Sequence, residues 1–339
     1  MPSILRLFDF KRPGALHIII LIRERFFMQN YKFYLAPLRG ITDHIFRDVY
    51  ERHFGRFDFM LAPFVPTVRG DRVRDYHIVD LLREEERTRL IPQVIGSDSA
   101  GFLLLCNKFA DMGFSSVNWN LGCPAPLITK KSRGCGLLPH GDIIKRFLDD
   151  VIPKLPIPMS IKTRLGLDKN DELYNLMSAF NKCQLREIII HPRTGAQAYG
   201  GKTDLDKFEE CLRISKHTIV YNGDICSIDD FKYLAKRFPT IENWMIGRGI
   251  IKNPFLLNEL KNEVDNSEKT VISEKEKVKT KQEFLNNLLT ENLNHYNPTK
   301  VLGKMKELWQ YMGTNKEKIL HCETIEEYRE MILTLTLRF

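Results

Sequence analysis

The sequence predicts a (β/α)8 barrel followed by a small C-terminal all-α domain, and three observations support this prediction. Short apolar runs alternate with amphipathic helical patterns between residues 31 and 260, which is typical of a parallel sheet. Most of the runs are continuously apolar, as in strands that are buried on both faces. Eight such runs fall in this part of the chain, which matches the strand number and the size of the barrel.

The strands and helices follow one another in the order that such a barrel needs. A doubly wound open sheet is the alternative, but it would need fewer strands, and its usual GxGxxG turn is missing after the first run. The expected strands are Phe33–Pro37, Phe59–Phe64, Leu90–Ile95, Ser116–Asn120, Met159–Lys162, Glu187–His191, Thr218–Asn222 and Asn243–Ile246. The helices expected between them are Asp43–Phe54, Ala100–Met112, Asp142–Asp150, Glu172–Lys182, Asp204–Arg213 and Ser227–Lys236.

The chain changes in character after residue 260. Residues 261–281 are charged and lack aromatic side chains, as expected of a linker or of the start of a solvated helix. Helical patterns return within residues 282–339, which predicts a small helical domain after the linker. Its helices are expected at Gln282–His295, Val301–Met312 and Ile325–Leu335.

Residues 1–30 differ from both of these parts. Basic residues precede a short apolar run, Ala15–Ile22, which is too short to span a bilayer. The small-residue cleavage site of a signal peptide does not follow the run. We therefore expect an N-terminal extension ahead of the barrel, with Met28 as an alternative start of translation for which residues 1–27 would not be made.

Composition favours a globular protein with reduced thiols. Hydrophobic residues make up 43% of the chain and charged residues 28%, which excludes a disordered chain, a collagen-like repeat and a polytopic membrane protein. The seven cysteines are scattered without a CxxC pair, so we expect neither a disulfide framework nor a metal site, and a cytoplasmic location. The formal net charge of +8 is a weak indication of a polyanionic partner.

Polar residues gather where the expected strands end. In a (β/α)8 barrel the active site is built at the carboxyl ends of the strands. Six such residues lie at or near the ends of five of the eight expected strands, so chance is a poor explanation for them. They are Gln93, Asn118, Asn120, Lys162, His191 and Asn222, with Gly247 and Arg248 directly after the last strand.

The segment after the fourth expected strand carries a candidate catalytic cysteine. Cys123 lies in a tight turn between Gly122 and Pro124, from which its thiol can project into the barrel mouth. A thiol of ordinary acidity is mostly protonated at neutral pH and can donate a proton. Cys135 lies on the same segment, and spacing alone does not choose between the two thiols. A buried structural cysteine and a solvated charged loop are the alternatives for this segment, whose cations are Lys130, Lys131 and Arg133.

Two glycine-containing turns predict a phosphate site. They follow the seventh and eighth expected strands and read YNGD (221–224) and IGRG (246–249). The loops at these positions usually bind phosphate in such barrels. Gly223 and Gly247 would offer backbone N–H groups and Arg248 a positive charge, although two ordinary turns are the alternative. We expect a phosphate-bearing cofactor in the barrel mouth, with Lys162 directed at an anionic group.

Seven stretches of the sequence resemble the tRNA-dihydrouridine synthases, which are flavin-dependent (β/α)8 enzymes. The stretches occur in order over residues 35–256, and their combination is specific where NLGCP or NGD alone would not be. The helical tail also fits the family's architecture of a barrel followed by an RNA-binding domain. The stretches are LAPLRGITDHIFR, IPQVIG, VNWNLGCPAP, IKTRLG, IIHPRTGAQAYGG, YNGDI and IGRGIIKNPFL.

The resemblance implies an oxidoreductase that reduces the C5=C6 bond of specific uridines in tRNA, with FMN as cofactor and NADPH or NADH as reductant. It implies hydride transfer from the reduced flavin to C6 and proton transfer from Cys123 to C5. The uracil must first be extruded from the folded RNA. No stable protein partner and no membrane are implied. The sequence departs from the family at Leu38-Arg39, where Met and a smaller or acidic residue are common, and at HPRT in place of HGRT.

The resemblance also assigns residues to these roles. The flavin contacts that it implies are Ala36, Pro37, Leu38, Gln93, Lys162, His191, Asn222, Gly223, Asp224, Gly247 and Arg248. The substrate contacts that we expect are Asn118, Asn120, Lys130, Lys131 and Arg133. Further candidates for phosphate contacts, for each of which a solvated charged face is the alternative, are the lysines of 275–281 and Lys300, Lys304 and Lys306.

Three other functions compete with this reading. A flavin barrel that reduces a free pyrimidine or an enone would share the flavin contacts and would need no basic helical tail. A non-catalytic RNA-binding protein on the same scaffold would purify without flavin absorption, but it has no need of Cys123, Lys162 and His191 together. A flavin-free barrel enzyme with a phosphorylated substrate would also be colourless.

Overall fold

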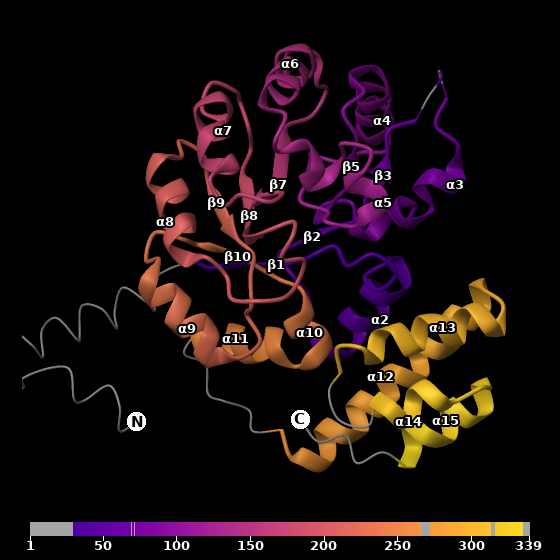
Figure 1. Cartoon of the computed structure of the whole chain (residues 1–339). Coiled ribbons are helices and arrows are strands. Elements are labelled where there is room, and N and C mark those ends of the chain that lie inside the picture. The colour runs from indigo at the N-terminus through magenta and orange to yellow at the C-terminus, as the bar shows by residue number, and fades with distance from the viewer. Residues whose placement is uncertain (1–29, 69, 71, 266–271, 313–315, 335–339) are drawn as a thin grey trace, which may run out of the picture.

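A computed structural model describes residues 30–68, 70, 72–265, 272–312 and 316–334. It confirms the predicted architecture, a barrel ringed by helices with a helical domain at one side (Figure 1). The expected N-terminal extension lies outside the described residues, apart from Asn30. Within the described residues, we find no helix with the length and apolar character that crossing a membrane requires.

Ten parallel strands occupy eight positions, because two of the positions each hold two short strands. At the second position, β2 (Phe59–Leu61) lies within the expected strand, whereas β3 (Val65–Pro66) begins after its expected end at Phe64. At the third, β4 (Leu90–Ile91) and β5 (Gln93–Ile95) flank Pro92, which has no N–H for the ladder. The order β3-β5-β6-β7-β8-β9-β10-β1-β2-β4 therefore closes on itself, since β2 pairs with β4 and β3 with β5. The other strands are β1 (Lys32–Leu35), β6 (Val117–Leu121), β7 (Met159–Gly166), β8 (Ile188–Thr194), β9 (Ile219–Tyr221) and β10 (Asn243–Ile246).

Helices cover the outside of the ring and pack apolar side chains against it. On β6, for example, the Trp119 ring stacks on Phe147 of α6, with ring centroids 4.2 Å apart. Asp43 and Asp98 cap the first two of the long helices by accepting hydrogen bonds from backbone N–H groups. The barrel helices are α2 (His44–Phe54), α3 (Asp75–Ile78), α4 (Ser99–Asp111), α5 (Pro126–Thr129), α6 (Gly141–Val151), α7 (Glu172–Phe180), α8 (Leu205–Ile214), α9 (Ile228–Arg237), α10 (Arg248–Lys252) and α11 (Leu256–Val264).

The interior of the barrel is divided into an apolar floor and a polar mouth. The floor is a small buried cluster that is separate from the main core and comes from strands around the ring. The polar side chains lie on the same inward faces, closer to the carboxyl ends of the strands. The floor residues are Tyr34, Ala36, Leu61, Ile91, Ile189, Val220 and Met245.

The helical domain begins earlier than the apolar pattern indicates. α12 starts at Glu274, inside the segment expected as a linker or solvated helix start, because the Ser273 hydroxyl accepts a hydrogen bond from the N–H of Glu276 (3.2 Å) and caps it. The first turns of this helix are charged, so the apolar periodicity appears only from about residue 282. The domain comprises α12 (Glu274–His295), α13 (Pro298–Trp309), α14 (Lys316–His321) and α15 (Ile325–Thr334).

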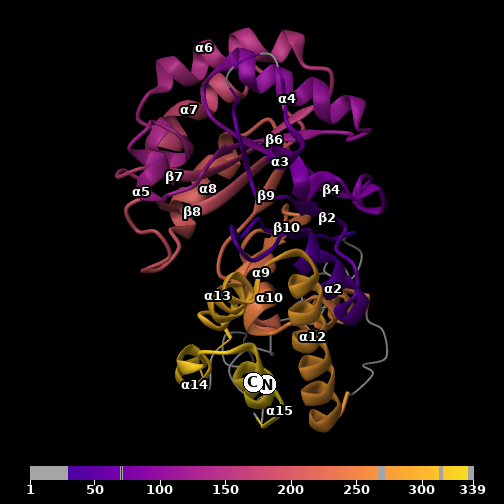
Figure 2. The same cartoon turned by 90° about the vertical axis from the view of Figure 1, so that its right-hand side faces the viewer.

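The helical domain is docked on α2 of the barrel. Phe284 of α12 meets the rings of Phe46, Tyr50 and Phe54 edge-on, with centroids 5.9, 6.4 and 5.1 Å away. An ion pair between Lys304 and Asp43 adds a polar contact. This packing places α13 and α14 beside the face of the barrel on which the strands end (Figure 2).

Candidate functional site

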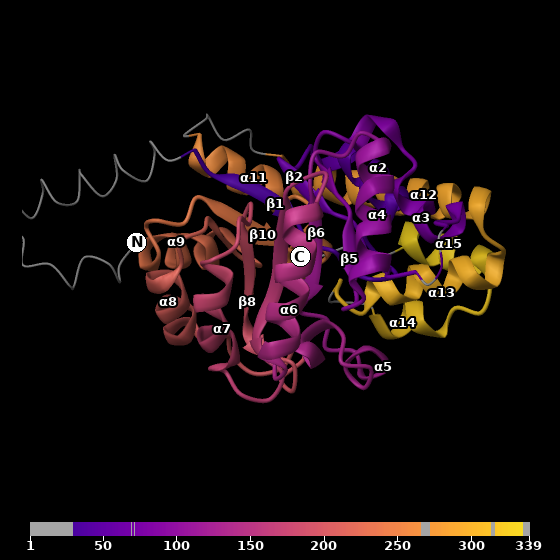
Figure 3. The same ribbon diagram turned by 90° about the horizontal axis from the view of Figure 1, so that it is seen from above.

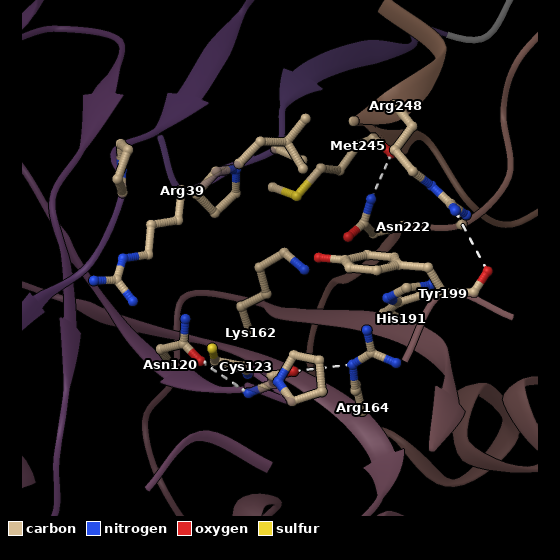
Figure 4. Close-up of a pocket in the computed structure, with 18 of the residues that line it drawn as sticks. Arg39, Asn120, Cys123, Lys162, Arg164, His191, Tyr199, Asn222, Met245 and Arg248 are labelled. Carbon is tan, nitrogen blue, oxygen red and sulfur yellow. Dashed lines mark hydrogen bonds between the residues drawn. The ribbon is translucent and has the colours of Figure 1, made fainter. Parts of the chain in front are cut away.

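A cavity of about 920 Å³, its open mouth included, lies at the carboxyl ends of the strands. Figure 4 shows Cys123, Lys162, Tyr199 and Asn222 directed into the same space. The structure brings into this one cavity the following expected site residues: Ala36, Pro37, Leu38, Gln93, Asn120, Cys123, Lys162, His191, Asn222, Gly223, Asp224, Gly247 and Arg248.

The alternation of side chains along two neighbouring strands, β7 and β8, explains why polar groups converge here. Successive residues of a strand point to opposite faces, so every second residue faces the interior. On β7 these are Ser160, Lys162 and Arg164, and on β8 they are His191 and Arg193. The inner face of each strand thus runs from small or apolar side chains at the floor to charged side chains at the mouth.

A chain of side-chain amides fixes the turn that carries Cys123. The Asn120 side-chain oxygen accepts hydrogen bonds from the N–H groups of Gly122 (3.0 Å) and Cys123 (2.9 Å). The amide nitrogen of Asn120 donates to the Gln93 side-chain oxygen (2.8 Å), and Gln93 donates in turn to Asn118 (2.7 Å). The cysteine turn and Gln93 are therefore held by the same network.

Four of the expected substrate contacts, all within the described residues, do not line the cavity. Asn118 is fully buried behind Gln93 and donates to Ser160 Oγ (2.8 Å), so its side chain orients Gln93. Lys130 and Lys131 are exposed on the turn after α5, and Arg133 is half-buried beyond it. These three cations lie at the rim because α5 carries the chain away from the cavity before it returns at Gly134.

The structure separates the two cysteines between which spacing could not choose. The thiol of Cys123 lines the cavity. Cys135 is fully buried, and its N–H and thiol both donate to the carbonyl of Cys123 (3.2 and 3.3 Å). Burial raises the pKa of the Cys135 thiol to about 12. Cys135 is thus a support for the cysteine turn, and Cys123 is the thiol that a ligand can reach.

Whether the Lys162 side chain is charged depends on what occupies the cavity. Burial, followed by the nearby Arg164 guanidinium, lowers the pKa of Lys162 to about 7, against a smaller opposing effect of Cys123. A ligand that carries negative charge beside Lys162 would reverse this shift, because it would stabilise the ammonium form. The residue is therefore suited to bind an anionic group or a group that becomes anionic.

His191 is a neutral hydrogen-bonding group at this site. Burial, followed by the charges of Arg164 and Lys162, holds the pKa of His191 well below its ordinary value. Arg193 Nη1 lies 3.1 Å from His191 Nε2. Since a guanidinium group only donates, Nε2 is the acceptor and the proton of the neutral ring is on Nδ1.

Among the cavity residues that sequence reasoning missed, Arg164 and Tyr199 make the most informative contacts. Arg164 donates to the carbonyls of Gly122 (2.9 Å) and Thr194 (2.8 Å), which ties the cysteine turn to the loop after β8. Tyr199 on that loop lies between two guanidinium groups, with its ring centroid 5.4 Å from Arg164 and 4.9 Å from Arg248. The signal for Arg164 was its place two residues after Lys162 on one strand, whereas no periodicity marks a loop residue such as Tyr199.

Asp224 lines the cavity, and its side chain is already paired with two arginines. Its carboxylate pairs with Arg193 (2.5 Å) and Arg248 (2.8 Å), and its backbone φ is +43°. A carboxylate in this position would repel a phosphate, so what the side chain does here is hold Arg248 in place. The backbone N–H groups of Arg248 and Gly249 lie in the first turn of α10, where donors are free to bind an acceptor from outside the helix.

A family model described as dihydrouridine synthase matches residues 34–332, which is well over half of the chain. The chain is 28% identical over 231 residues to tRNA-dihydrouridine synthase B of Pasteurella multocida, covering 66% of this chain and 67% of the relative. It is 27% identical over 232 residues to tRNA-dihydrouridine(16) synthase of Pseudomonas putida, covering 66% of this chain and 71% of that protein.

A solved structure is similar in fold. The histamine dehydrogenase of Rhizobium sp. 4-9 superposes with a TM-score of 0.53 at 10% identity, covering 69% of this chain and 46% of that one. At this identity the similarity extends to the barrel fold and not to the substrate.

Proposed function

Because the chain belongs to the dihydrouridine synthase family, we propose that it reduces uridines of tRNA in the cavity at the barrel mouth, with Cys123 as the proton donor. Family membership confirms the expected enzyme class, a flavin-dependent oxidoreductase with FMN and a nicotinamide reductant that forms dihydrouridine in tRNA. The observation that carries the assignment of residues is that Cys123 and Lys162 open into the same cavity as the two glycine-containing turns.

The residues present fit FMN. At one end of the cavity, the turns at 222–224 and 247–249 offer backbone N–H donors and Arg248, which suit a phosphate group. At the other end, Gln93 and Lys162 offer donors to an aromatic ring system, and Ala36 and Pro37 offer an apolar edge. When bound, FMN would supply the redox chemistry, while the protein supplies position and charge.

Cys123 is placed to protonate a base that lies over the cavity. Its backbone is fixed by Asn120, and its carbonyl accepts two hydrogen bonds from Cys135. A thiol that is already fixed loses little conformational entropy when the substrate binds. For this reason a positioned acid transfers a proton faster than water does. Lys162 and His191 then remain to bind the polar edge of the ligand.

The RNA would be held by cations around the mouth and on the helical domain. Lys130 and Lys131 are exposed and remain candidates, as do Lys300 and Lys306. Lys304 is instead paired with Asp43, and Lys281 is only 2% exposed, so both serve packing. A cytoplasmic location for the enzyme is consistent with this substrate and is part of the proposal.

The decisive experiment measures dihydrouridine by mass spectrometry in unmodified tRNA incubated with the purified protein, FMN and NADPH. We expect product with the wild type and a loss of about 10²- to 10⁴-fold in rate with Cys123→Ala, which is the usual contribution of a general acid. Cys135→Ala is the matched control, and it should lower thermal stability while keeping most of the activity of the folded enzyme.

Two results would contradict the proposal. Equal activity of Cys123→Ala and the wild type would remove Cys123 from the chemistry. A yellow, NADPH-oxidising protein that forms no dihydrouridine in tRNA and reduces free uracil or another small molecule would instead be a small-molecule flavin reductase.

A further inference from the structure

Leu127 has the highest exposure of the large apolar side chains in the described part of the chain, at 77%. Single exposed leucines are common on protein surfaces, so exposure alone indicates nothing. The position of this one is unusual, because it lies on α5, which follows the Cys123 turn directly. The surroundings of Leu127 therefore decide whether it has a role.

The backbone under Leu127 is rigidly joined to the backbone of Cys123. α5 rests on the turn at 134–137, where a Cβ atom on Gly136 would come within 2.6 Å of the Thr129 carbonyl. On the same turn, a Cβ atom on Gly134 would come within 2.5 Å of the Cys123 carbonyl. These close approaches link α5 to the cysteine turn through a shared backbone support, so Leu127 has a fixed position relative to the thiol.

The direction in which α5 projects places Leu127 beside the path of an incoming RNA. Figures 2 and 3 show α5 extending from the barrel on the side that also carries the loop after β8 and helices α13 and α14. The exposed cations Lys130 and Lys131 directly follow α5. An apolar side chain flanked by positive charge beside a cavity suits contact with nucleobases whose phosphates are held nearby.

We propose that Leu127 is a wedge that enters the base stack of the RNA and occupies the space left by the extruded uridine. This inference rests on the proposed function, since it requires a uridine that leaves its stack to reach the cavity. Proteins that unstack bases often insert an apolar side chain between base steps. Leu127 acts as a positioning residue: it contacts the bases beside the target and takes no part in the chemistry.

The first test compares single-turnover rates of Leu127→Ala and the wild type on two RNAs. On folded tRNA we expect Leu127→Ala to react on the order of tenfold more slowly than the wild type. The variant loses the apolar burial that the leucine side chain gains when it enters the base stack. On an unstructured single-stranded RNA, where the target uridine is already unstacked, the two proteins should react equally. Leu127→Met should restore the rate on folded tRNA.

Tyr233→Ala is the matched control, because Tyr233 is an exposed apolar side chain on the barrel helix α9. It should react like the wild type on both RNAs. Reduction of bound flavin by NADPH without RNA should be the same in all of these proteins.

A second measurement follows the extrusion itself. A tRNA with 2-aminopurine beside the uridine that the wild type reduces should become more fluorescent on binding the wild type, and much less so on binding Leu127→Ala. Equal rates on folded tRNA, or an equal loss on both RNAs, would overturn the wedge. If the wild type makes no dihydrouridine in either RNA, the proposed function fails and the wedge fails with it.

Discussion

Lys162 shows how a single side chain in this cavity depends on its ligand. In the cavity alone, burial and Arg164 lower the pKa of Lys162 to about 7. Its ammonium group therefore titrates in the physiological range, although lysine ordinarily stays charged well above it. Binding of FMN that depends on the charged form would then be coupled to uptake of a proton.

This coupling predicts a pH dependence for FMN binding. Below pH 7 Lys162 is already charged, and affinity should be insensitive to pH. Above pH 7 the free protein loses the proton that the complex retains, so the dissociation constant should rise by up to about tenfold per pH unit. Calorimetric titration at pH 8 in two buffers of different ionisation enthalpy should show proton uptake in the wild type and none in Lys162→Met. The absence of uptake in the wild type would contradict the assignment.

At the residue scale, the sequence was enough to predict the inward-facing polar residues of the strands. It was not enough to predict the roles of residues that act by holding another residue in place. Gln93 lies within an apolar run, and Lys162 and His191 follow apolar runs, which is a pattern in one dimension. In the structure β7 and β8 continue beyond Lys162 and His191. The role of Asp224 as a partner of two arginines depends on the fold that brings Arg193 and Arg248 to it. The choice between Cys123 and Cys135 likewise required burial, which spacing does not contain.

Among the elements, the cysteine turn depends on a glycine that is not in any strand or helix of the barrel wall. Gly134 has a φ of +57°, and a side chain there would collide with the carbonyl and Cβ of Cys123. Gly113 has a comparable φ of +87°, and a Cβ there would meet open space. An alanine at Gly113 would therefore suffer only the strain of a left-handed backbone, whereas an alanine at Gly134 would also collide with Cys123.

This comparison predicts different effects for two alanine substitutions. Gly113→Ala should lower the free energy of unfolding by about 1 kcal/mol, from backbone strain alone, with turnover unchanged. Gly134→Ala should lower stability by more and reduce turnover strongly, because the thiol must move with its backbone. Denaturant unfolding and single-turnover kinetics would check both. If Gly134→Ala retains full turnover, the placement of Cys123 does not depend on this turn.

Most strands and helices could be predicted because their apolar periodicity is local. Most of the exceptions have local physical causes. Pro92 interrupts one expected strand. Helices α3, α5, α10 and α14 have four to six residues and are too short to show a period. The nine-residue helix α11 was not predicted either. The start of α12 was predicted too late, because the charged first turns of that helix carry no apolar pattern and only the Ser273 cap marks its beginning.

At the scale of the whole molecule, Phe284 is at the centre of the aromatic contacts between the barrel and the helical domain. Phe284 is nearly fully buried among the rings of α2. Its packing joins the two parts, whereas the cavity is built almost wholly from the barrel. Loss of this contact should therefore affect RNA binding more than cofactor binding.

We accordingly predict that Phe284→Ala lowers the free energy of unfolding by about 3–5 kcal/mol and weakens tRNA binding, with FMN affinity unchanged. Phe208→Ala is a suitable comparison, because Phe208 is equally buried in the barrel among Tyr221 and Phe238. It should cost similar stability without a selective loss of tRNA binding. Thermal unfolding and filter binding of tRNA would measure both. Equal losses of tRNA affinity in the two variants would show that docking at Phe284 does not orient the RNA.

The docking of α12 on α2 also constrains how this enzyme can be re-engineered or can diverge. The rings that Phe284 contacts belong to a barrel helix, with Phe46, Tyr50 and Phe54 contributed by α2. A chimera that exchanges only the C-terminal domain would leave these rings facing a foreign surface. To transplant the target preference of another synthase onto this barrel, the exchanged unit must include the outer face of α2.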